Sequence, residues 1–93
     1  MTNISYAISD DVVMREDDFV IYSRRTGAVL STNLSGFAFS LIFSNCMPYP
    51  SACNLLADAI DEDRYLVHTV FESFFAELIA GGFIVETESR TVT

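Results

Sequence analysis

The chain has 93 residues, of which 51 % are hydrophobic and 19 % are charged. This length fits one small domain, and the apolar content excludes an intrinsically disordered protein, because the surface available for burial offsets the loss of chain entropy. The formal net charge of −8 comes from 13 acidic residues against 5 arginines, with no lysine. The balance argues against a nucleic-acid partner, since phosphate binding depends on basic side chains.

Neither a membrane segment nor a signal peptide is indicated. No segment reaches the roughly 18 consecutive apolar residues of a membrane helix, and residues 1–5 lack the basic start and apolar run of a signal peptide. We therefore expect a cytoplasmic protein with no membrane partner. In that compartment Cys46 and Cys53 are expected to stay reduced as free thiols.

The N-terminal part of the chain predicts a small antiparallel sheet. In residues 1–10 apolar and polar side chains alternate only weakly, and this segment is interpreted as a flexible lead-in. The charged triplet 16–18 suits one tight turn, and the segment 23–27 suits another, with Gly27 available for a positive φ. These turns separate three β-rich runs that are expected to form a meander: residues 12–15, 19–22 and 28–32.

The middle of the chain predicts a helix. After Asn33 the apolar period changes from two to about 3.6, and Asn33 or Ser35 is the expected N-cap of a helix that ends near Asn45. Its core face is expected to hold Leu34, Phe37, Ala38, Leu41 and Ile42. Phe39 and Phe43 lie off that face and leave two interpretations open: an exposed patch for a partner protein or a second copy of the chain, or a thicker core.

Two further helices are predicted after the proline-containing segment 48–50. The second, short helix has an apolar face formed by Ala52, Leu55, Leu56, Ala59 and Ile60. Acidic residues 61–63 favour the start of the third helix, and Gly81–Gly82 ends it. Its apolar stripe comprises Val67, Val70, Phe71, Phe74, Phe75, Leu78 and Ile79. Residues 83–85 are expected as a short strand or an extended segment before a flexible tail, residues 86–93.

The residue types required for catalysis are sparse. His68 is the single histidine and has no nucleophile at a motif spacing, while the two cysteines supply too few ligands for a zinc site. The glycines form no phosphate-binding loop. We therefore expect a binding module with no catalytic residues, no metal and no cofactor.

Four short segments carry a resemblance to a known family: residues 12–18, 26–30, 33–36 and 77–83. In this order they resemble the PqqD-like family of small peptide chaperones, also called RiPP recognition elements. The resemblance covers residues 11–85. It implies an α+β fold, in which a three-stranded antiparallel β-meander is followed by a three-helix winged helix-turn-helix.

The sequence departs from the family pattern at three positions. Phe19 stands where a glycine is common, Leu34 replaces a usual proline, and Ser40 takes a position often held by a large aromatic residue. The resemblance therefore implies the family and no particular subfamily.

The function implied by the resemblance is peptide recognition without catalysis. Such a module binds the leader region of a ribosomally synthesised precursor peptide and delivers it to a modifying enzyme. The enzyme would be a radical SAM maturase, a peptidase or a cyclase.

A physical account of this binding starts from the third strand of the meander. An uncovered edge offers unpaired backbone groups to an incoming peptide, along Ala28, Val29, Leu30, Ser31 and Thr32. The other wall of the groove is expected on one flank of the third helix, formed by Leu66, Val70, Ser73 and Glu77. Two questions stay open here. Leu66 and Val70 either face the groove or are core or scattered surface residues. Arg24 and Arg25 either bind acidic residues of the leader or form a solvated turn.

Two rival interpretations remain. A winged-helix transcription factor would have similar elements, but the net charge and the lack of arginine or lysine between Tyr65 and Ala80 oppose DNA binding. The domain is alternatively a regulatory part of a larger enzyme. A homodimer is also left open.

Overall fold

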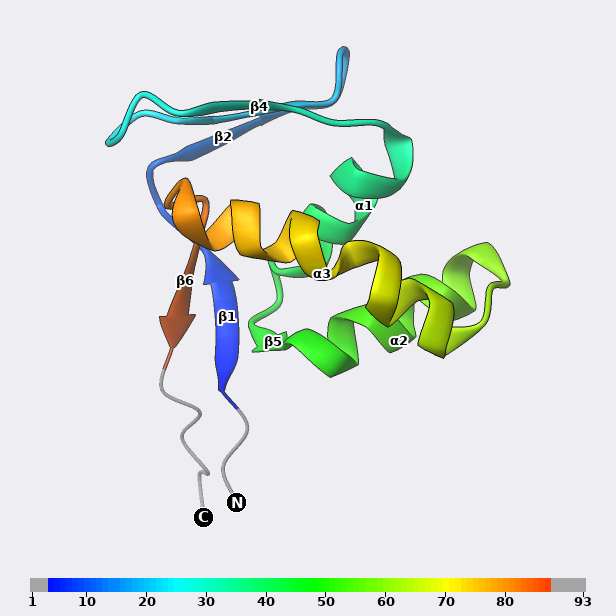
Figure 1. Ribbon diagram of the computed structural model, residues 1–93. Coiled ribbons are helices and arrows are strands. Elements are labelled where there is room, and N and C mark those ends of the chain that lie inside the picture. The colour runs from blue at the N-terminus through cyan, green and yellow to red at the C-terminus, as the bar shows by residue number, and fades with distance from the viewer. Residues whose placement is uncertain (1–3, 88–93) are drawn as a thin grey trace.

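The computed structural model describes residues 4–87, which form three helices and two small sheets (Figure 1). The elements in chain order are β1 (Ser5–Ile8), β2 (Val12–Arg15), β3 (Val20–Ser23), β4 (Val29–Ser31), α1 (Leu34–Ile42), β5 (Met47–Pro48), α2 (Tyr49–Ile60), α3 (Arg64–Ala80) and β6 (Ile84–Thr87). No helix in this part of the chain has the length and apolarity needed to cross a bilayer.

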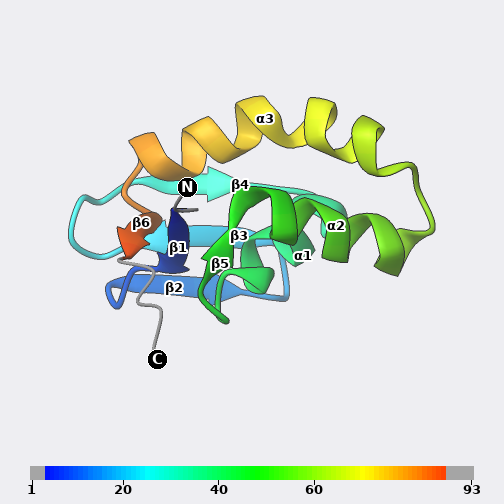
Figure 2. The same cartoon turned by 90° about the horizontal axis from the view of Figure 1, so that it is seen from below.

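The first sheet is the predicted meander. Its strand order is β2-β3-β4, and both strand pairs are antiparallel. Figure 2 shows its strands side by side, with β4 nearest to α3. The α+β class and the three helices that follow the meander are confirmed.

The second sheet corrects the prediction for the two ends of the chain. Ser5–Ile8 is not a lead-in but the central strand of the order β5-β1-β6, where it pairs antiparallel with both neighbours. The strand expected around 83–85 is present as β6, and it includes Glu86 and Thr87, which were assigned to the tail. Its partner lies at the opposite end of the sequence, so local patterning carried no signal for this pairing. The rest of the predicted lead-in and tail, residues 1–3 and 88–93, lies outside the described residues.

Side-chain caps start two of the helices. The Asn33 side chain accepts a hydrogen bond from the Gly36 N–H at 2.8 Å, which confirms one of the two predicted caps of α1. Asp63 caps α3 by accepting from the Leu66 N–H at 3.1 Å. At the other end of α3, Gly82 has φ +74°, a conformation that suits glycine and helps to end the helix.

The buried face of α1 differs from the predicted one. Phe39 and Phe43 are fully buried, so the interpretation as a thicker core is right and the exposed patch is excluded. Leu34 is 67 % exposed and Leu41 is 43 % exposed, although both were expected in the core. The reason is that α1 is covered by aromatic side chains of α2 and α3, which select a face that apolar spacing alone did not distinguish.

The buried face of α2 also differs from the predicted one, and the buried face of α3 is a narrower part of the predicted stripe. In α2 the buried residues are Ala52, Cys53, Leu56 and Ala57, while Leu55, Ala59 and Ile60 are exposed. In α3 only Val67 and Leu78 are buried, the three phenylalanines are half-buried, and Val70 and Ile79 are exposed. A helix in a small domain buries a narrow stripe, so several residues of an apolar face remain in water.

Phe39 stacks on Phe71 with ring centroids 4.9 Å apart and meets Phe43 edge-on at 5.3 Å. We predict that Phe39→Ala lowers the free energy of unfolding by about 3 to 5 kcal/mol, because it leaves a cavity where helices meet. Leu41→Ala, on the same helix and half-exposed, is the control and is expected to cost much less. Urea denaturation measures both, and similar losses would contradict the central position of Phe39.

Tyr49 supplies a second, pH-dependent prediction. Burial raises the pKa of its hydroxyl above the ordinary value of about 10, with smaller contributions from Cys53 and Glu72. The hydroxyl also donates to the His68 carbonyl at 2.7 Å. When the pKa of a phenol is higher in the folded than in the unfolded state, its contribution to the free energy of unfolding is fully present below the unfolded-state pKa. This contribution is lost as the pH rises from the unfolded-state pKa through the folded-state pKa.

The free energy of unfolding is therefore expected to fall more steeply above about pH 10 in the native chain than in Tyr49→Phe. The quantity to compare is the slope of the free energy of unfolding against pH. Its absolute value also differs at neutral pH, because the variant lacks the hydrogen bond to the His68 carbonyl. Equal slopes in the two proteins would show that the Tyr49 hydroxyl ionises as easily folded as unfolded.

Candidate peptide-binding site

β4 is an edge strand with one paired side and one open side. On the paired side, the Ala28 carbonyl accepts from the Ser23 N–H at 2.9 Å, and the Thr32 N–H donates to the Phe19 carbonyl at 2.9 Å. β4 ends the strand order β2-β3-β4, so no strand of the described chain pairs with its other side.

The register identifies which backbone groups of β4 are free. Leu30 is the partner of Ile21, and its backbone groups point to β3, as do the bonded groups of Ala28 and Thr32. Because successive residues of an antiparallel strand direct their N–H and C=O groups to opposite sides, those of Val29 and Ser31 point to the open edge. The Val29 side chain is 62 % exposed on the outer face of the sheet. The predicted edge is therefore present, with two residues available for pairing.

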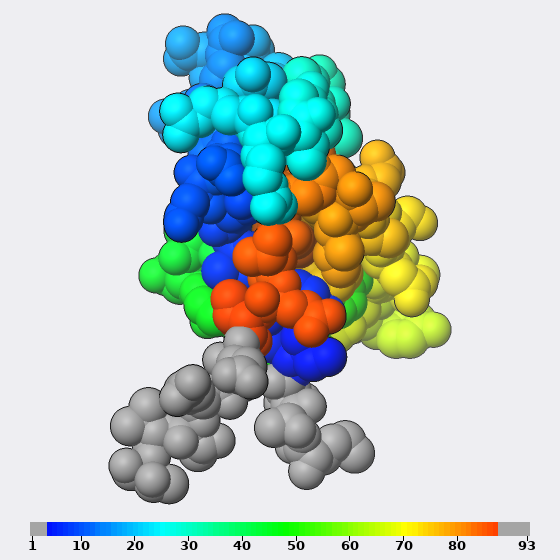
Figure 3. Space-filling model, turned by 90° about the vertical axis from the view of Figure 1, so that its left-hand side faces the viewer, coloured from blue at the N-terminus to red at the C-terminus, as the bar shows by residue number. Residues whose placement is uncertain are grey.

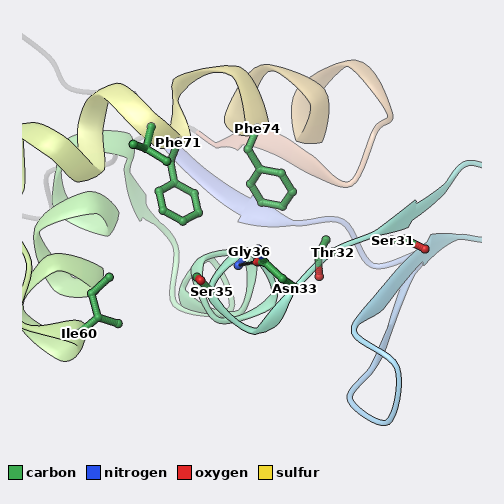
Figure 4. Close-up of a pocket in the computed structure, with 9 residues that line it drawn as sticks. Ser31, Thr32, Asn33, Ser35, Gly36, Ile60, Phe71 and Phe74 are labelled. Carbon is green, nitrogen blue, oxygen red and sulfur yellow. Dashed lines mark hydrogen bonds between the residues drawn. The ribbon is translucent and has the colours of Figure 1, made fainter.

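A hollow of about 450 Å³ adjoins the end of this edge. Figure 4 shows Phe71 and Phe74 of α3 on one side of it, and the residues from β4 to the start of α1 on the other. The complete lining is Ser31, Thr32, Asn33, Ser35, Gly36, Ile60, Val70, Phe71 and Phe74. The hollow thus has an apolar wall from α2 and α3 and a polar wall around the N-terminus of α1.

Gly36 keeps the two walls of the hollow close. A Cβ atom at this position would lie 3.3 Å from the Thr32 Cβ and 3.4 Å from the Phe74 Cζ. The first distance is tighter than ordinary van der Waals contact and the second leaves no spare room, so a side chain here would require Thr32 or the start of α1 to shift slightly. The absence of a side chain therefore lets β4, α1 and α3 meet.

The structure brings some of the predicted site residues together and separates others. Ser31, Thr32 and Val70 line the hollow, and Ala28, Val29 and Leu30 form the approach along the strand. Leu66, Ser73 and Glu77 are exposed on α3 but do not line it. Leu66 and Val70 are 48 % and 60 % exposed, so their interpretation as core residues is excluded.

Sequence reasoning missed the remaining lining residues, which are Asn33, Ser35, Gly36, Ile60, Phe71 and Phe74. Phe71 and Phe74 were assigned to the core, and in the structure their half-buried rings serve both the core and the hollow. The segment Asn33–Gly36 was recognised as a helix start and as one of the segments that carry the family resemblance, but not as part of the site. Gly36, which lies in the first turn after the cap residue Asn33, was the one sequence feature that indicated a close contact between this helix start and its neighbours.

The arginines of the turn before β4 are only loosely held. Arg25 Nε lies 3.8 Å from an Asp11 carboxylate oxygen, and both side chains are mostly exposed. An exposed pair at this distance contributes little stability. No carboxylate of residues 4–87 lies within ion-pair distance of Arg24.

Neither His68 nor Cys53 is among the residues that line the hollow. No group of three histidine, cysteine or acidic side chains between residues 4 and 87 is arranged to hold a metal ion. His68 lies beside the Tyr49 ring, with centroids 5.5 Å apart, and burial raises the pKa of the Cys53 thiol, which disfavours a nucleophilic thiolate. A scan against family models, a search of curated proteins and a search of solved structures found no match to the chain.

The exposure of Val70 gives a matched pair of substitutions on α3. Val70→Asp is expected to change the free energy of unfolding by less than about 1 kcal/mol, because the carboxylate stays in water. Val67→Asp is expected to unfold the domain, because Val67 is only 3 % exposed and the charge would lack a partner. Thermal melts measure both, and an unfolded Val70→Asp protein would place Val70 in the core.

Proposed function

We propose that this domain is a non-catalytic module that binds the leader region of a ribosomally synthesised precursor peptide and delivers it to a modifying enzyme. The observation that carries the proposal is the open edge of β4 next to a hollow with one apolar wall. An extended peptide added to this edge gains main-chain hydrogen bonds, while one of its apolar side chains enters the hollow.

Each half of this arrangement has a separate role in recognition. Hydrogen bonds to Val29 and Ser31 depend on the peptide backbone, so they provide affinity with little dependence on sequence. The rings of Phe71 and Phe74 favour a large apolar side chain at one position of the peptide. Such a division suits a module that must bind an extended peptide and still discriminate between peptide sequences.

Local geometry adds support to the resemblance to PqqD-like proteins. Phe19 occupies the position where a glycine is common in that family, and its φ of +56° is a conformation that favours glycine. The segment Asn33–Gly36, one of those that carry the resemblance, forms the cap of α1 and part of the hollow. A backbone conformation that favours glycine, held by a different residue, is what a divergent member of the family would have.

The proposal includes the enzyme partner and the compartment. The modifying enzyme would be a radical SAM maturase, a peptidase or a cyclase, and the domain would act in the cytoplasm, where precursor peptides are synthesised and thiols such as Cys46 stay reduced. That the domain forms a homodimer, and that it is a regulatory part of a larger enzyme, are two further possibilities that stay predictions. DNA binding is the weaker candidate, because α3 between Tyr65 and Ala80 presents no arginine or lysine to a phosphate backbone.

Strand addition is tested by removing one outward backbone donor. Val29→Pro deletes the N–H that points to the open edge, and it leaves the hydrogen bonds between β3 and β4 in place. We expect at least a tenfold loss of affinity for the cognate leader peptide with little change in stability. Val29→Thr keeps the N–H and is the control, with affinity close to that of the native chain.

Titration with the leader, followed by backbone amide shifts, locates the site. Shifts are expected at residues 28–36 and on α3 around Val70. Shifts confined to β1, β5 and β6, or an affinity that is equal in the proline and threonine variants, would contradict strand addition at β4.

Delivery is tested in a mixture with the modifying enzyme. The domain is expected to raise the rate of modification of the full-length precursor, because holding the leader near the enzyme increases the effective concentration of the core peptide. Deletion of the leader should remove this gain without changing the activity of the enzyme alone. A rate that is independent of the domain, at saturating leader binding, would leave recruitment unsupported.

A further inference from the structure

Charge is distributed unevenly along the open edge of β4. The Thr32 N–H bonds to the Phe19 carbonyl, so the turn between β2 and β3 lies at the C-terminal end of β4. Ile60 lines the hollow at the same end, and the α2–α3 connection follows it directly. Two loops from distant parts of the sequence therefore lie toward the same end of β4.

Both loops are acidic. The segments 15–18 and 58–64 together hold seven acidic residues and two arginines, a formal charge of −5. The arginines are already engaged: Arg15 lies 3.4 Å from Asp18, and Arg64 lies 3.4 Å from Asp58. Asp61 and Glu62 are exposed and take part in no ion pair among the described residues.

The other end of β4 is close to neutral. Arg24 and Arg25 lie in the turn that leads into β4, opposite Asp11 of the preceding connection. Figure 3 shows this turn next to the C-terminal end of α3, where the Thr26 hydroxyl donates to the Gly81 carbonyl at 3.2 Å. With Asp10 and Glu77 included, this end holds three acidic residues and two arginines, a formal charge of −1.

We propose that the groove selects a peptide with lysine or arginine on the N-terminal side of its apolar anchor, bound antiparallel to β4. This inference rests on the proposed function and specifies its ligand. An antiparallel peptide runs from the Thr32 end towards the Ala28 end, so its N-terminal residues lie at the end of β4 toward which the two acidic loops are placed. Its anchor enters the hollow, and the residues that follow pair with Ser31 and Val29.

The direction of the added strand decides where the basic residues must stand. Both strand pairs of the meander are antiparallel, and antiparallel pairing is slightly more stable per residue than parallel pairing. A parallel peptide would instead require basic residues on the C-terminal side of the anchor. The position of the basic residues in bound peptides therefore reports strand direction and charge matching together.

The first experiment uses a display library of random peptides of about 12 residues, long enough for a strand with flanks at roughly 3.3 Å per residue. Peptides are selected on the native chain and, in parallel, on Val29→Pro. We expect sequences enriched only on the native chain to carry an apolar anchor preceded by lysine or arginine, at about threefold the frequency of the same residues after the anchor.

The second experiment measures how one enriched peptide depends on the acidic loop. Asp61→Asn with Glu62→Gln removes two charges, and Asn tolerates the left-handed conformation of Asp61, which has φ +57°. The N-cap Asp63 is left intact. The control is Asp10→Asn with Glu86→Gln, which removes the same total charge from exposed positions away from the acidic end.

At low ionic strength the loop variant is expected to lose about three- to tenfold in affinity, while the control changes by less than twofold. The difference should shrink near physiological salt, since these charges are exposed. Equal losses in both variants would overturn the inference.

The selection separates failure of this inference from failure of the proposed function. Peptides that bind the native chain and not Val29→Pro, but show no basic bias or a bias after the anchor, overturn the inference and leave strand addition standing. A library with no sequence enriched on the native chain over Val29→Pro overturns strand addition at β4, and the inference with it.

Discussion

The packing of Phe39 against the aromatic residues of the other helices is the interaction on which the arrangement depends. Its fully buried ring stacks on Phe71 and meets Tyr49 and Phe74 edge-on, so α1, α2 and α3 converge on one side chain. A domain of this size has a small core, so a ring that contacts all three helices has a large share in holding them together. The cluster therefore sets the position of α3 relative to β4.

The groove follows from that position. Phe71 and Phe74 contact Phe39 on one side and line the hollow on the other, so the wall of the site is held by the core itself. The facing wall is held by the Asn33 cap and by Gly36, whose lack of a side chain lets α1 approach Phe74. A wall fixed in this way needs little ordering when a ligand enters, which lowers the entropic cost of binding.

Sequence reasoning succeeded where structure depends on a few neighbouring residues. The meander, the turn at Gly27 and the cap at Asn33 are determined by turn chemistry and short-range hydrogen bonds. It was wrong where the outcome depended on distant residues. The apolar spacing of α1 was equally compatible with a face containing Leu41 and one containing Phe39, and contacts with α2 and α3 made the choice.

The sequence by itself determined the α+β class, the three-stranded meander with β4 at its edge, the three helices and the acidic character of the loops. It could do so because secondary structure, turns and charge are read from short windows of residues. Only the tertiary structure decided that Ser5–Ile8 pairs with Ile84–Thr87 and that Ile60 and Phe74 border the same hollow as Ser31. These contacts join residues far apart in the chain, and their formation depends on how the whole core packs rather than on any local pattern.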